Sequence, residues 1–560
     1  MRWYRAVAMD LDGTLTLGGW PSEAVLGAVD GLRADGVRTL LVTGRILADL
    51  DVEFPGLADR FDLVVGENGG VLRSSGWTRP LADPVDPNLL ERLHDAGVRA
   101  RRGEVLLACD GSADHLALDA IESLGLDVQL VRNRAALMLI PSGVTKGTGM
   151  REGLAELGVS PHNTLAVGDA ENDHSMLTAA GLGVAVANAV AGLRDHADLV
   201  LAESDGAGVS ALLTGPVLTG QRPVRTLRRR IVLGTGVDQQ PAVLPAAQTN
   251  LMVTGASESG KSYLAGLVVE QLAALGYVLL VIDPEGDHVS LGALRGVTVL
   301  AGNQLPDPAE VPTLYGQGLS CLILDLSSLH RPGREDYLRR MWPAVAAYRA
   351  ETALPHWIVL EEAQNLGWCH HAGLDTPDLG EWGLCLVSYQ PDRIAAPVLD
   401  RMRWRVELSP GGHSAILTPP DGPPMPITIG RRTTPHVRHW HKYVDSPLPD
   451  HERFAFHTAP GGPAPVAANL REFLTLLPDL PDEVITFHAR RHDFSRWLAG
   501  VYRDHVLASL IATCEQDLVA HGDPRRTRRL LAELVTVRYL PPERTTAAVT
   551  RASPIRTGEE

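Results

Sequence analysis

Residues 6–15 read AVAMDLDGTL, and this stretch decides the fold of the N-terminal part of the chain. The apolar run AVAM leads directly into two carboxylates, Asp10 and Asp12. A short apolar run of this kind is typical of a buried strand in a parallel sheet. Because open α/β sheets bind ligands at the carboxyl ends of their strands, the stretch predicts a strand that presents a polar site.

Similar apolar runs recur through the first 215 residues. TLLVTG, DLVVGE and TLAVGD are each followed by sequence with helical character. Strands that alternate with helices indicate an α/β fold with a parallel sheet. We therefore expect residues 1–215 to form an α/β domain.

The residues at the predicted strand ends suit phosphoryl transfer. Asp10 and Asp12 repel each other unless a cation lies between them, and Mg²⁺ prefers one or two carboxylates together with a substrate phosphate. A hydroxyl, a lysine and a second acidic pair follow later in the chain and predict a complete site. They are Thr43 in LLVTGR, Lys146 in VTKGTG, and Asp169 and Asp173 in AVGDAENDHSM.

These residue types divide the work of hydrolysis. Asp10 would attack phosphorus and form an aspartyl-phosphate, while Asp12 would protonate the leaving oxygen and then activate water. Thr43 and Lys146 would hold the phosphate oxygens. A single DxD is more often a solvated turn, but four motifs in one order favour the catalytic interpretation. The predicted magnesium ligands are Asp10, Asp12, Asp169 and Asp173.

The four motifs resemble those of the haloacid dehalogenase superfamily phosphatases. DLDGTL, VTGR, VTKGTGM and GDAENDHSML match them in order across nearly all of residues 1–215, and VVGENGGVL is similar to the type IIB, Cof-like branch. This resemblance implies a Rossmann-like core with an α/β cap inserted within about residues 75–145. A cap that excludes water favours a small phosphorylated metabolite over a polymer. Relatives act on sugar phosphates, sucrose phosphate and phosphoglycolate, and the cap sequence does not choose among them.

A second motif, GASESGKS at residues 255–262, fits the pattern GxxxxGK[ST]. It follows the apolar run NLMV and precedes a helix-like sequence, which is the context that a phosphate-binding loop requires. Gly255 and Gly260 would let backbone amides turn toward a β-phosphate at a helix N-terminus. Lys261 would reach the β and γ phosphates, and the Ser262 hydroxyl would bind Mg²⁺. The motif predicts an ATP site.

Acidic residues after a later strand complete this prediction. WIVLEEAQN supplies Glu361, which would support the magnesium ion, and Glu362, which would polarise the attacking water. Gln390 follows the apolar run CLVS and would sense the γ-phosphate or orient water. Alternatively, Gln390 is only a polar residue that ends its strand, and the sequence favours neither interpretation.

The second region resembles the HerA-like branch of P-loop ATPases. LGTG, GASESGKS, VLLVIDPEGDH, CLILDLSS, IVLEEAQN and VSYQ occur in that order within about residues 230–430. The resemblance implies a P-loop NTPase α/β domain over residues 216–430, and a homo-oligomer, a hexamer if the domain works as a motor. An arginine from a neighbour would then complete each site. Arg401, Arg403 and Arg405 lie late in the domain, although a solvated basic strand explains them better.

Residues 431–560 are predicted to be a mainly helical region with a disordered tail. Pro-rich sequence from Pro410 to Pro435 leads into it. The WCHH run at residues 368–371 lacks a spaced second pair and is a weak zinc candidate. The histidines of the C-terminal region lack the spacing of a metal site, and we interpret them as surface or internally bonded residues. They are His441, His451, His457, His488 and His492.

Composition limits the function classes. The 560 residues include 51 Lys and Arg against 67 Asp and Glu, and the net charge of −16 argues against coating nucleic acid or anionic membrane through bulk charge. The N-terminus has no signal-peptide pattern, and no run approaches the ~18 apolar residues of a membrane span. The five cysteines form no CxxC pair. We therefore expect a cytoplasmic protein without a membrane partner.

The predicted function is a magnesium-dependent phosphatase acting on a small phosphorylated metabolite, fused to a module that binds and hydrolyses ATP. The alternative is a nucleic-acid processing ATPase with an end-trimming phosphatase, either a HerA-like motor or a protein of the polynucleotide kinase-phosphatase type. Against the kinase type, LEEAQN suits water activation, and a cap would obstruct a polynucleotide. The sequence leaves nucleic-acid binding open. A nonenzymatic scaffold is disfavoured because every motif residue is present in both sites.

Overall fold

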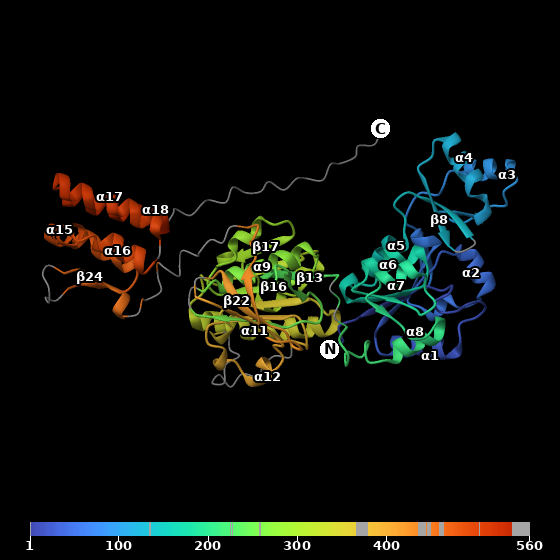
Figure 1. Cartoon of the computed structure of the whole chain (residues 1–560), viewed down its shortest axis with the longest axis horizontal. Helices are drawn as coiled ribbons and strands as arrows, with labels where there is room; N and C mark the ends of the chain where they lie inside the picture. The colour runs from blue at the N-terminus through green and yellow to red at the C-terminus, as the bar shows by residue number, and fades with distance from the viewer. Residues whose placement is uncertain are drawn as a thin grey trace. The chain divides into compact units, whose positions relative to one another are not determined.

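The structure is a computed structural model of the chain, and its described residues form two compact units. The first unit comprises Met1–Pro284 and His288–His436, and the second comprises Glu285–Asp287 and Val437–Glu560 (Figure 1). The described residues are 2–133, 136–224, 226, 228–256, 259–365, 379–410, 412–434, 444, 448, 450–457, 464–502 and 504–539.

An eight-stranded sheet organises the N-terminal part of the first unit. Its first six strands are parallel, and the last two are antiparallel. β1 is buried along its whole length, as its apolar sequence predicts. The prediction of an α/β fold with a Rossmann-like core is confirmed. In spatial order the strands are β12 (Leu199–Val200), β11 (Leu182–Ala185), β10 (Thr164–Gly168), β1 (Ala6–Met9), β2 (Arg38–Val42), β3 (Leu63–Gly66), β4 (Val71–Ser74) and β5 (Trp77–Pro80).

Helices pack on this sheet through apolar or small residues. In α1, Val25, Leu26, Val29 and Leu32 are buried at helical spacing, and Ser22 caps the helix by accepting the N–H of Val25. α5 instead buries glycines, which bring its backbone close to the sheet. The helices are α1 (Glu23–Ala34), α2 (Leu47–Glu53), α5 (Lys146–Glu156), α6 (His174–Ala179), α7 (Ala191–His196) and α8 (Asp205–Thr214).

A smaller α/β module is inserted between β5 and α5, and we call residues 87–141 the inserted module. Its four antiparallel strands lie in the order β6–β7–β9–β8. It has an apolar core of its own, to which α3 and the sheet contribute leucines and α4 contributes Ala117, Ala120 and Ile121. The elements are α3 (Pro87–Asp95), β6 (Arg101–Arg102), β7 (Leu107–Asp110), α4 (Asp114–Leu124), β8 (Val128–Asn133) and β9 (Ala136–Pro141).

Glu67 ties the inserted module to the sheet. It follows β3 with a positive φ of 52° and is fully buried. Its carboxylate accepts the backbone N–H groups of Glu104, Val105 and Leu106 at 2.9, 2.8 and 3.2 Å. Gly103 is required beside it, because a Cβ there would lie 2.5 Å from the Glu67 Oε2 atom. One buried carboxylate therefore sets the position of the β6–β7 turn.

An eleven-stranded sheet forms the rest of the first unit. Seven neighbouring strands, from β21 to β17, are parallel, and the remaining four are antiparallel. In spatial order they are β14 (Pro241–Pro245), β13 (Arg230–Gly236), β23 (Met425–Ile429), β22 (Ser414–Thr418), β21 (Trp404–Leu408), β15 (Leu251–Gly255), β20 (Leu384–Ser388), β19 (Trp357–Leu360), β16 (Leu279–Asp283), β18 (Cys321–Asp325) and β17 (Val297–Ala301). The helices are α9 (Lys261–Ala274), α10 (Thr313–Gly316), α11 (Arg331–Thr352) and α12 (Ala396–Leu399).

The two sheets of the first unit share an apolar core, which runs from Trp3 to Ile427 along the chain. Arg228 and Arg229 strengthen the junction, because their guanidinium groups donate to the carbonyls that end α6; Arg228 reaches the Leu177 oxygen at 2.6 Å. Cations stabilise a helix C-terminus. His162 stacks on Tyr277 across the same junction, with ring centroids 4.0 Å apart.

The described residues of the second unit form mainly helices, which pack around an aromatic core. Phe454, Phe473, Phe494 and Trp497 pack with ring centroids between 5.0 and 5.9 Å. The elements are β24 (Phe454–Ala455), β25 (Val466–Ala467), α14 (Leu470–Leu476), α15 (Asp482–Arg490), α16 (Asp493–Gly500), α17 (His505–His521) and α18 (Pro524–Tyr539).

Two described histidines of this unit, His488 and His492, have structural bonds, while the His451 side chain is exposed. His488 Nδ1 bonds the Asp493 carboxylate at 2.9 Å, and His492 Nδ1 bonds that of Glu515 at 3.1 Å. Within the described part of the chain, no histidine belongs to a group that could hold a metal ion. His441 and the WCHH run lie outside the described residues.

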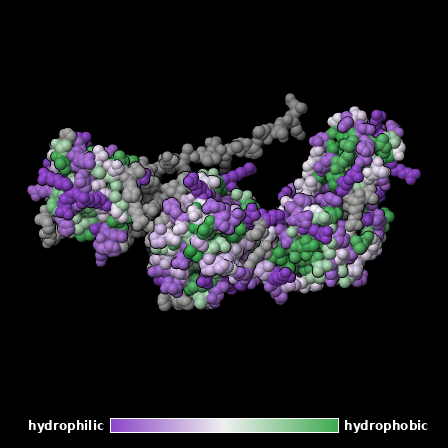
Figure 2. All heavy atoms as spheres, viewed as in Figure 1, coloured by the Kyte–Doolittle hydropathy of each residue, from purple (hydrophilic) through white to green (hydrophobic). Residues whose placement is uncertain are grey.

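Hydrophilic and hydrophobic residues are mixed on the face drawn in Figure 2. Among the described helices, none has both the length and the apolar character needed to cross a membrane.

Candidate active site

The predicted site residues follow neighbouring strands of the eight-stranded sheet. β1 pairs with β2 and β10 so that Met9 lies beside Leu41 and Val167. Asp10, Thr43 and Asp169 come just after these strands and therefore meet at one edge. Backbone bonds extend the register, since Asp10 N donates to the Val167 carbonyl at 3.1 Å.

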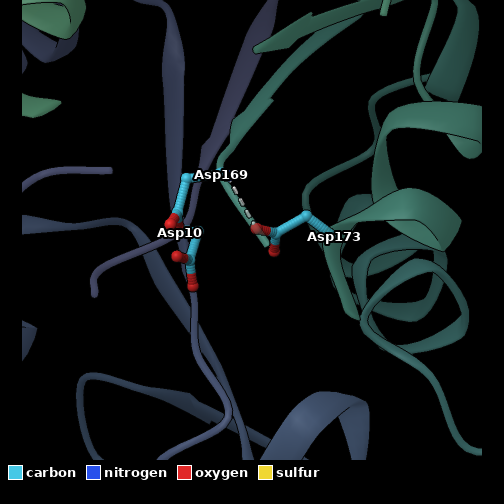
Figure 3. A group of neighbouring side chains, drawn as sticks. All are labelled: Asp10, Asp169 and Asp173. Atoms are coloured by element: carbon cyan, nitrogen blue, oxygen red, sulfur yellow. Dashed lines mark hydrogen bonds between the residues drawn. The ribbon is translucent and has the colours of Figure 1, made fainter. Parts of the chain in front are cut away.

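Three carboxylates converge there. One oxygen from each of Asp10, Asp169 and Asp173 lies within 4.8 Å of the other two, and all three residues are at least 97% buried (Figure 3). Asp173 Oδ2 accepts the N–H groups of Asp169 and Ala170 at 2.9 and 3.0 Å, which closes the turn after β10. Gly168 makes that turn feasible, because a Cβ there would lie 2.6 Å from the Asp173 carboxylate.

Lys146 supplies the cation of this cluster. It is the first residue of α5, and its Nζ donates to Asp10 Oδ1 at 2.5 Å and to Asp173 Oδ1 at 2.6 Å. Burial alone would lower the pKa of Lys146, but the carboxylates of Asp10 and Asp173 outweigh it and raise that pKa. Lys146 is therefore held as an ammonium ion.

The donor set fits a magnesium ion. Lys146 bonds two of the three buried carboxylates, and negative charge inside a protein is costly unless cations lie beside it. Burial, and then the neighbouring Asp173 carboxylate, raise the pKa of Asp10 well above its usual range. Oxygen donors of this kind suit a hard divalent cation. Asp10, Asp169 and Asp173 could hold it.

Asp12 lies apart from this group. Both of its oxygens accept bonds from Arg45, whose Nε and Nη2 atoms are each 2.7 Å away. Arg45 also pairs with Glu53, and its guanidinium lies 5.0 Å from the ring centroid of Phe54. Sequence reasoning did not single out Arg45. The available signal was its place in VTGR, two residues after Thr43, whose Oγ1 accepts the Arg45 N–H at 3.2 Å.

The glycine-rich loop after β15 forms a second candidate site. Gly260 has a φ of 90° and caps α9, and a Cβ there would lie 3.3 Å from the Gly412 Cα. Gly255 is also confined, because its Cβ would lie 2.4 Å from Ser259 Oγ. Lys261 Nζ donates to the Ala256 carbonyl at 2.8 Å. Two residues of the loop, at positions 257 and 258, lie outside the described residues.

Glu361 connects this loop to the end of β19. Its Oε2 accepts the Ser262 hydroxyl at 3.3 Å, and its Oε1 lies 2.8 Å from His288 Nε2. Glu361 and His288 are buried, with Glu361 only 3% exposed, and Ser262 is partly buried. His288 was absent from the sequence-based candidates, because only the fold brings the DPEGDH loop beside β19.

Glu362 and Gln390 belong to a neighbouring polar network. Glu362 has a positive φ of 50° and accepts a bond from Gln364, which in turn accepts the Ser388 hydroxyl at 2.6 Å. Gln390 donates its backbone N–H to Ser388 at 3.0 Å, and its side-chain oxygen accepts from Arg393 at 3.2 Å.

The three arginines considered for completing a neighbour's site are exposed: Arg401, Arg403 and Arg405. Arg401 and Arg405 donate to nearby backbone carbonyls at 3.3 and 3.2 Å.

The N-terminal part of the chain is similar in sequence to known hydrolases. The model of a family described as haloacid dehalogenase-like hydrolase matches residues 125–213. A phosphoglycolate phosphatase of Halorubrum lacusprofundi is 33% identical over 220 residues, which cover 37% of this chain and 95% of that protein. One from Methanothermobacter thermautotrophicus is 34% identical over 218 residues, covering 37% and 96%.

A solved haloacid dehalogenase-like hydrolase from Bacteroides thetaiotaomicron is 21% identical, covers 38% of this chain and 98% of its own, and superimposes with a TM-score of 0.33. The sequence relatives span nearly their full lengths on this chain and share over 30% identity with it. Through this part of its sequence, the chain belongs to the haloacid dehalogenase-like hydrolases.

Proposed function

We propose that the chain is a magnesium-dependent phosphomonoesterase that acts on a small phosphorylated metabolite through an aspartyl-phosphate. The observation that carries this proposal is the buried cluster of Asp10, Asp169 and Asp173, in which Lys146 bridges Asp10 and Asp173. Phosphoglycolate is the first substrate to test, because the relatives bear that name. Sugar phosphates come second.

The residues divide the reaction into two displacements. In the first, an Asp10 oxygen bonds to phosphorus while the bond to the leaving oxygen breaks, and Asp12 gives that oxygen a proton. In the second, water attacks phosphorus, Asp12 takes its proton, and the bond from phosphorus to Asp10 breaks. Asp12 must leave Arg45 to perform either transfer. Thr43 and Lys146 would hold the phosphate oxygens.

Magnesium would neutralise the charge that develops on the phosphoryl oxygens. Asp10, Asp169 and Asp173 would supply its carboxylate ligands. A fourth carboxylate ligand, Asp12, would join them only if it turned away from Arg45.

We propose that the inserted module is a cap over this site. A cavity of ≈ 630 Å³ lies between the module and the turn that carries Asp173. Its size suits a small substrate rather than a polymer. The lining residues are Asp114, Leu118, Leu130, Val131, Arg132 and Leu137 from the module, with Glu171 and Asn172 from the core.

The test is hydrolysis of phosphoglycolate and a panel of sugar phosphates by the full-length chain with and without Mg²⁺. Asp10→Asn should abolish release of phosphate from every substrate. Asp119→Asn, the same change on the exposed face of α4, is the matched control and should retain full activity. Retained activity in the Asp10 variant, or none in the wild type with any panel member, would overturn the proposal.

A second function is supported by the eleven-stranded sheet. We propose that it binds and hydrolyses ATP, because Ser262 and Glu361 touch beside the glycine-rich loop, as two residues sharing a magnesium ion would. Gly255 and Gly260 leave little room for a side chain in the described part of this loop, which suits close approach of the backbone to a phosphate. In addition, the buried Ser259 Oγ has no hydrogen-bond partner within the described part of the chain. Gly255, Gly260, Lys261 and Ser262 would contact the nucleotide and its metal, Glu362 would activate water, and Gln390 would orient it.

Nucleotide binding by the full chain tests this second function. Lys261→Ala should abolish binding of a fluorescent ATP analogue and leave hydrolysis of phosphoglycolate intact. A hexamer in the presence of ATP would support a motor-like assembly, and a monomer would contradict it. Unchanged nucleotide affinity in the Lys261 variant would remove the proposed site.

The proposal includes three domains with the limits 1–215, 216–430 and 431–560. It also includes a cytoplasmic location, which the free thiols of the described cysteines suit.

A further inference from the structure

His288 lies in a place where a histidine can control the proposed ATP site. It is fully buried, five residues beyond the end of β16, and its backbone N–H donates to Asp283 Oδ2 at 2.8 Å. Strand β16 pairs with β19 in register, with Ile282 beside Leu360. The sheet therefore brings the His288 loop next to Glu361, although the two residues are 73 positions apart.

The bond between these side chains has a defined direction. His288 Nε2 lies 2.8 Å from Glu361 Oε1. An ionised carboxylate can only accept hydrogen bonds, so a bond to ionised Glu361 requires the His288 tautomer in which Nε2 carries the proton. The bond uses one oxygen of Glu361 and leaves the other, Oε2, beside the Ser262 hydroxyl at 3.3 Å.

Glu361 depends on this bond more than on the one from Ser262. A buried carboxylate is costly unless its oxygens are hydrogen-bonded, and the contact from His288 is the shorter of the two. Residues behind a metal ligand orient it, and their loss typically weakens metal binding. A carboxylate without His288 would be free to rotate away from Ser262.

We propose that His288 is a positioning residue of the ATP site: it fixes Glu361 so that Oε2 and the Ser262 hydroxyl together face the metal ion of a bound nucleoside triphosphate. This inference rests on the proposed ATP site. It goes beyond that site by adding a residue outside the glycine-rich loop and outside the LEEAQN segment, and it assigns that residue to metal binding rather than to the nucleotide itself.

The experiment measures metal binding directly in the full-length chain. Mn²⁺ is titrated into the complex with a nonhydrolysable ATP analogue and followed by electron paramagnetic resonance, while binding of the analogue in EDTA is measured separately. His288→Phe keeps a ring and removes the donor. It should weaken Mn²⁺ binding by roughly 10- to 100-fold and leave binding of the analogue in EDTA unchanged.

Two further variants separate positioning from general damage. His288→Gln keeps a donor that can reach Glu361 and should restore most of the Mn²⁺ affinity. His356→Phe alters another fully buried histidine, which directly precedes β19 and whose Nδ1 accepts the Val278 N–H at 2.8 Å. It should leave Mn²⁺ affinity unchanged. If His288→Phe does not fold, His288→Asn, whose amide is too short to reach Glu361, takes its place.

The outcomes distinguish the two proposals. A wild-type chain that binds no ATP analogue removes the ATP site and the inference with it. A wild-type chain that binds the analogue, with the same Mn²⁺ affinity in the His288 variants, removes only the role of His288. Equal losses in the His288→Phe and His288→Gln variants would also contradict positioning by a donated hydrogen bond.

Discussion

Removing the ammonium group of Lys146 should destabilise the first unit strongly, and magnesium should reverse much of the loss. Lys146→Met keeps most of the side-chain volume. It leaves Asp10 and Asp173 buried without the cation that now lies 2.5 and 2.6 Å from them. Breaking a buried ion pair by removing one partner costs about 3 to 5 kcal/mol. Because Lys146 serves two carboxylates, we expect the upper part of that range in EDTA.

The assay is urea unfolding of the full-length variant in EDTA and in saturating Mg²⁺. A divalent cation among the same carboxylates replaces the missing charge, so the loss should be smaller with Mg²⁺ than without it. Lys261→Met is the matched control, because Lys261 Nζ donates to a neutral backbone carbonyl, that of Ala256. It should cost less than Lys146→Met, about 1.5 to 3 kcal/mol. If Lys146→Met is as stable as the wild type in EDTA, or if Mg²⁺ restores nothing, the account of this cluster is wrong.

Three other changes test the supports of the site. Gly103→Ala should displace the Glu67 carboxylate, since the new Cβ would lie 2.5 Å from it. We expect a lower kcat/KM and faster proteolysis of the inserted module. Unchanged proteolysis would contradict the role of Glu67. Burial lowers the pKa of His162 to about 4. Between about pH 6.5 and pH 4, the unfolded chain therefore binds a proton at this residue that the folded chain does not bind. The free energy of unfolding should fall as the pH drops through this window, by at most about 3 kcal/mol. The neighbouring His356, whose pKa burial also lowers, contributes a dependence of the same sign, so His162→Phe should make the dependence shallower without removing it. Urea unfolding at several pH values measures the difference, and parallel curves would refute it. Asp12 must leave Arg45 before it can transfer a proton, so Arg45→Lys, which removes the two-bond contact, should raise kcat with little change in global stability, measured by steady-state kinetics and thermal unfolding. An unchanged or lower kcat would show that this contact does not restrain Asp12.

The sequence was informative where chemistry and strand ends coincide. Asp10 follows an apolar run that is fully buried as β1, and GDAEND follows another, β10. Apolar runs predict such strands because a parallel sheet is covered on both faces. The carboxyl ends of parallel strands share one edge, so the meeting of Asp10 with Asp169 was predictable.

Other features depend on contacts that no local pattern reveals. Arg45 reaches Asp12 across 33 positions, and the buried Glu67 bonds backbone groups 37 to 39 positions away. The Pro-rich stretch from residue 410 to 435 was interpreted as a lead into the next region, yet it contains β22 and β23 within the second sheet. Proline and glycine mark turns, and here they obscured the short strands between those turns.

Trapping the covalent intermediate tests whether Asp10 is the nucleophile. The full-length chain is mixed with ³²P-labelled phosphoglycolate and Mg²⁺, quenched in acid within one turnover, and digested for peptide mapping. We predict label on the peptide that contains Asp10 in the wild type and none in Asp10→Asn. Release of labelled phosphate by the wild type without a labelled Asp10 peptide at any time point would contradict the aspartyl-phosphate mechanism.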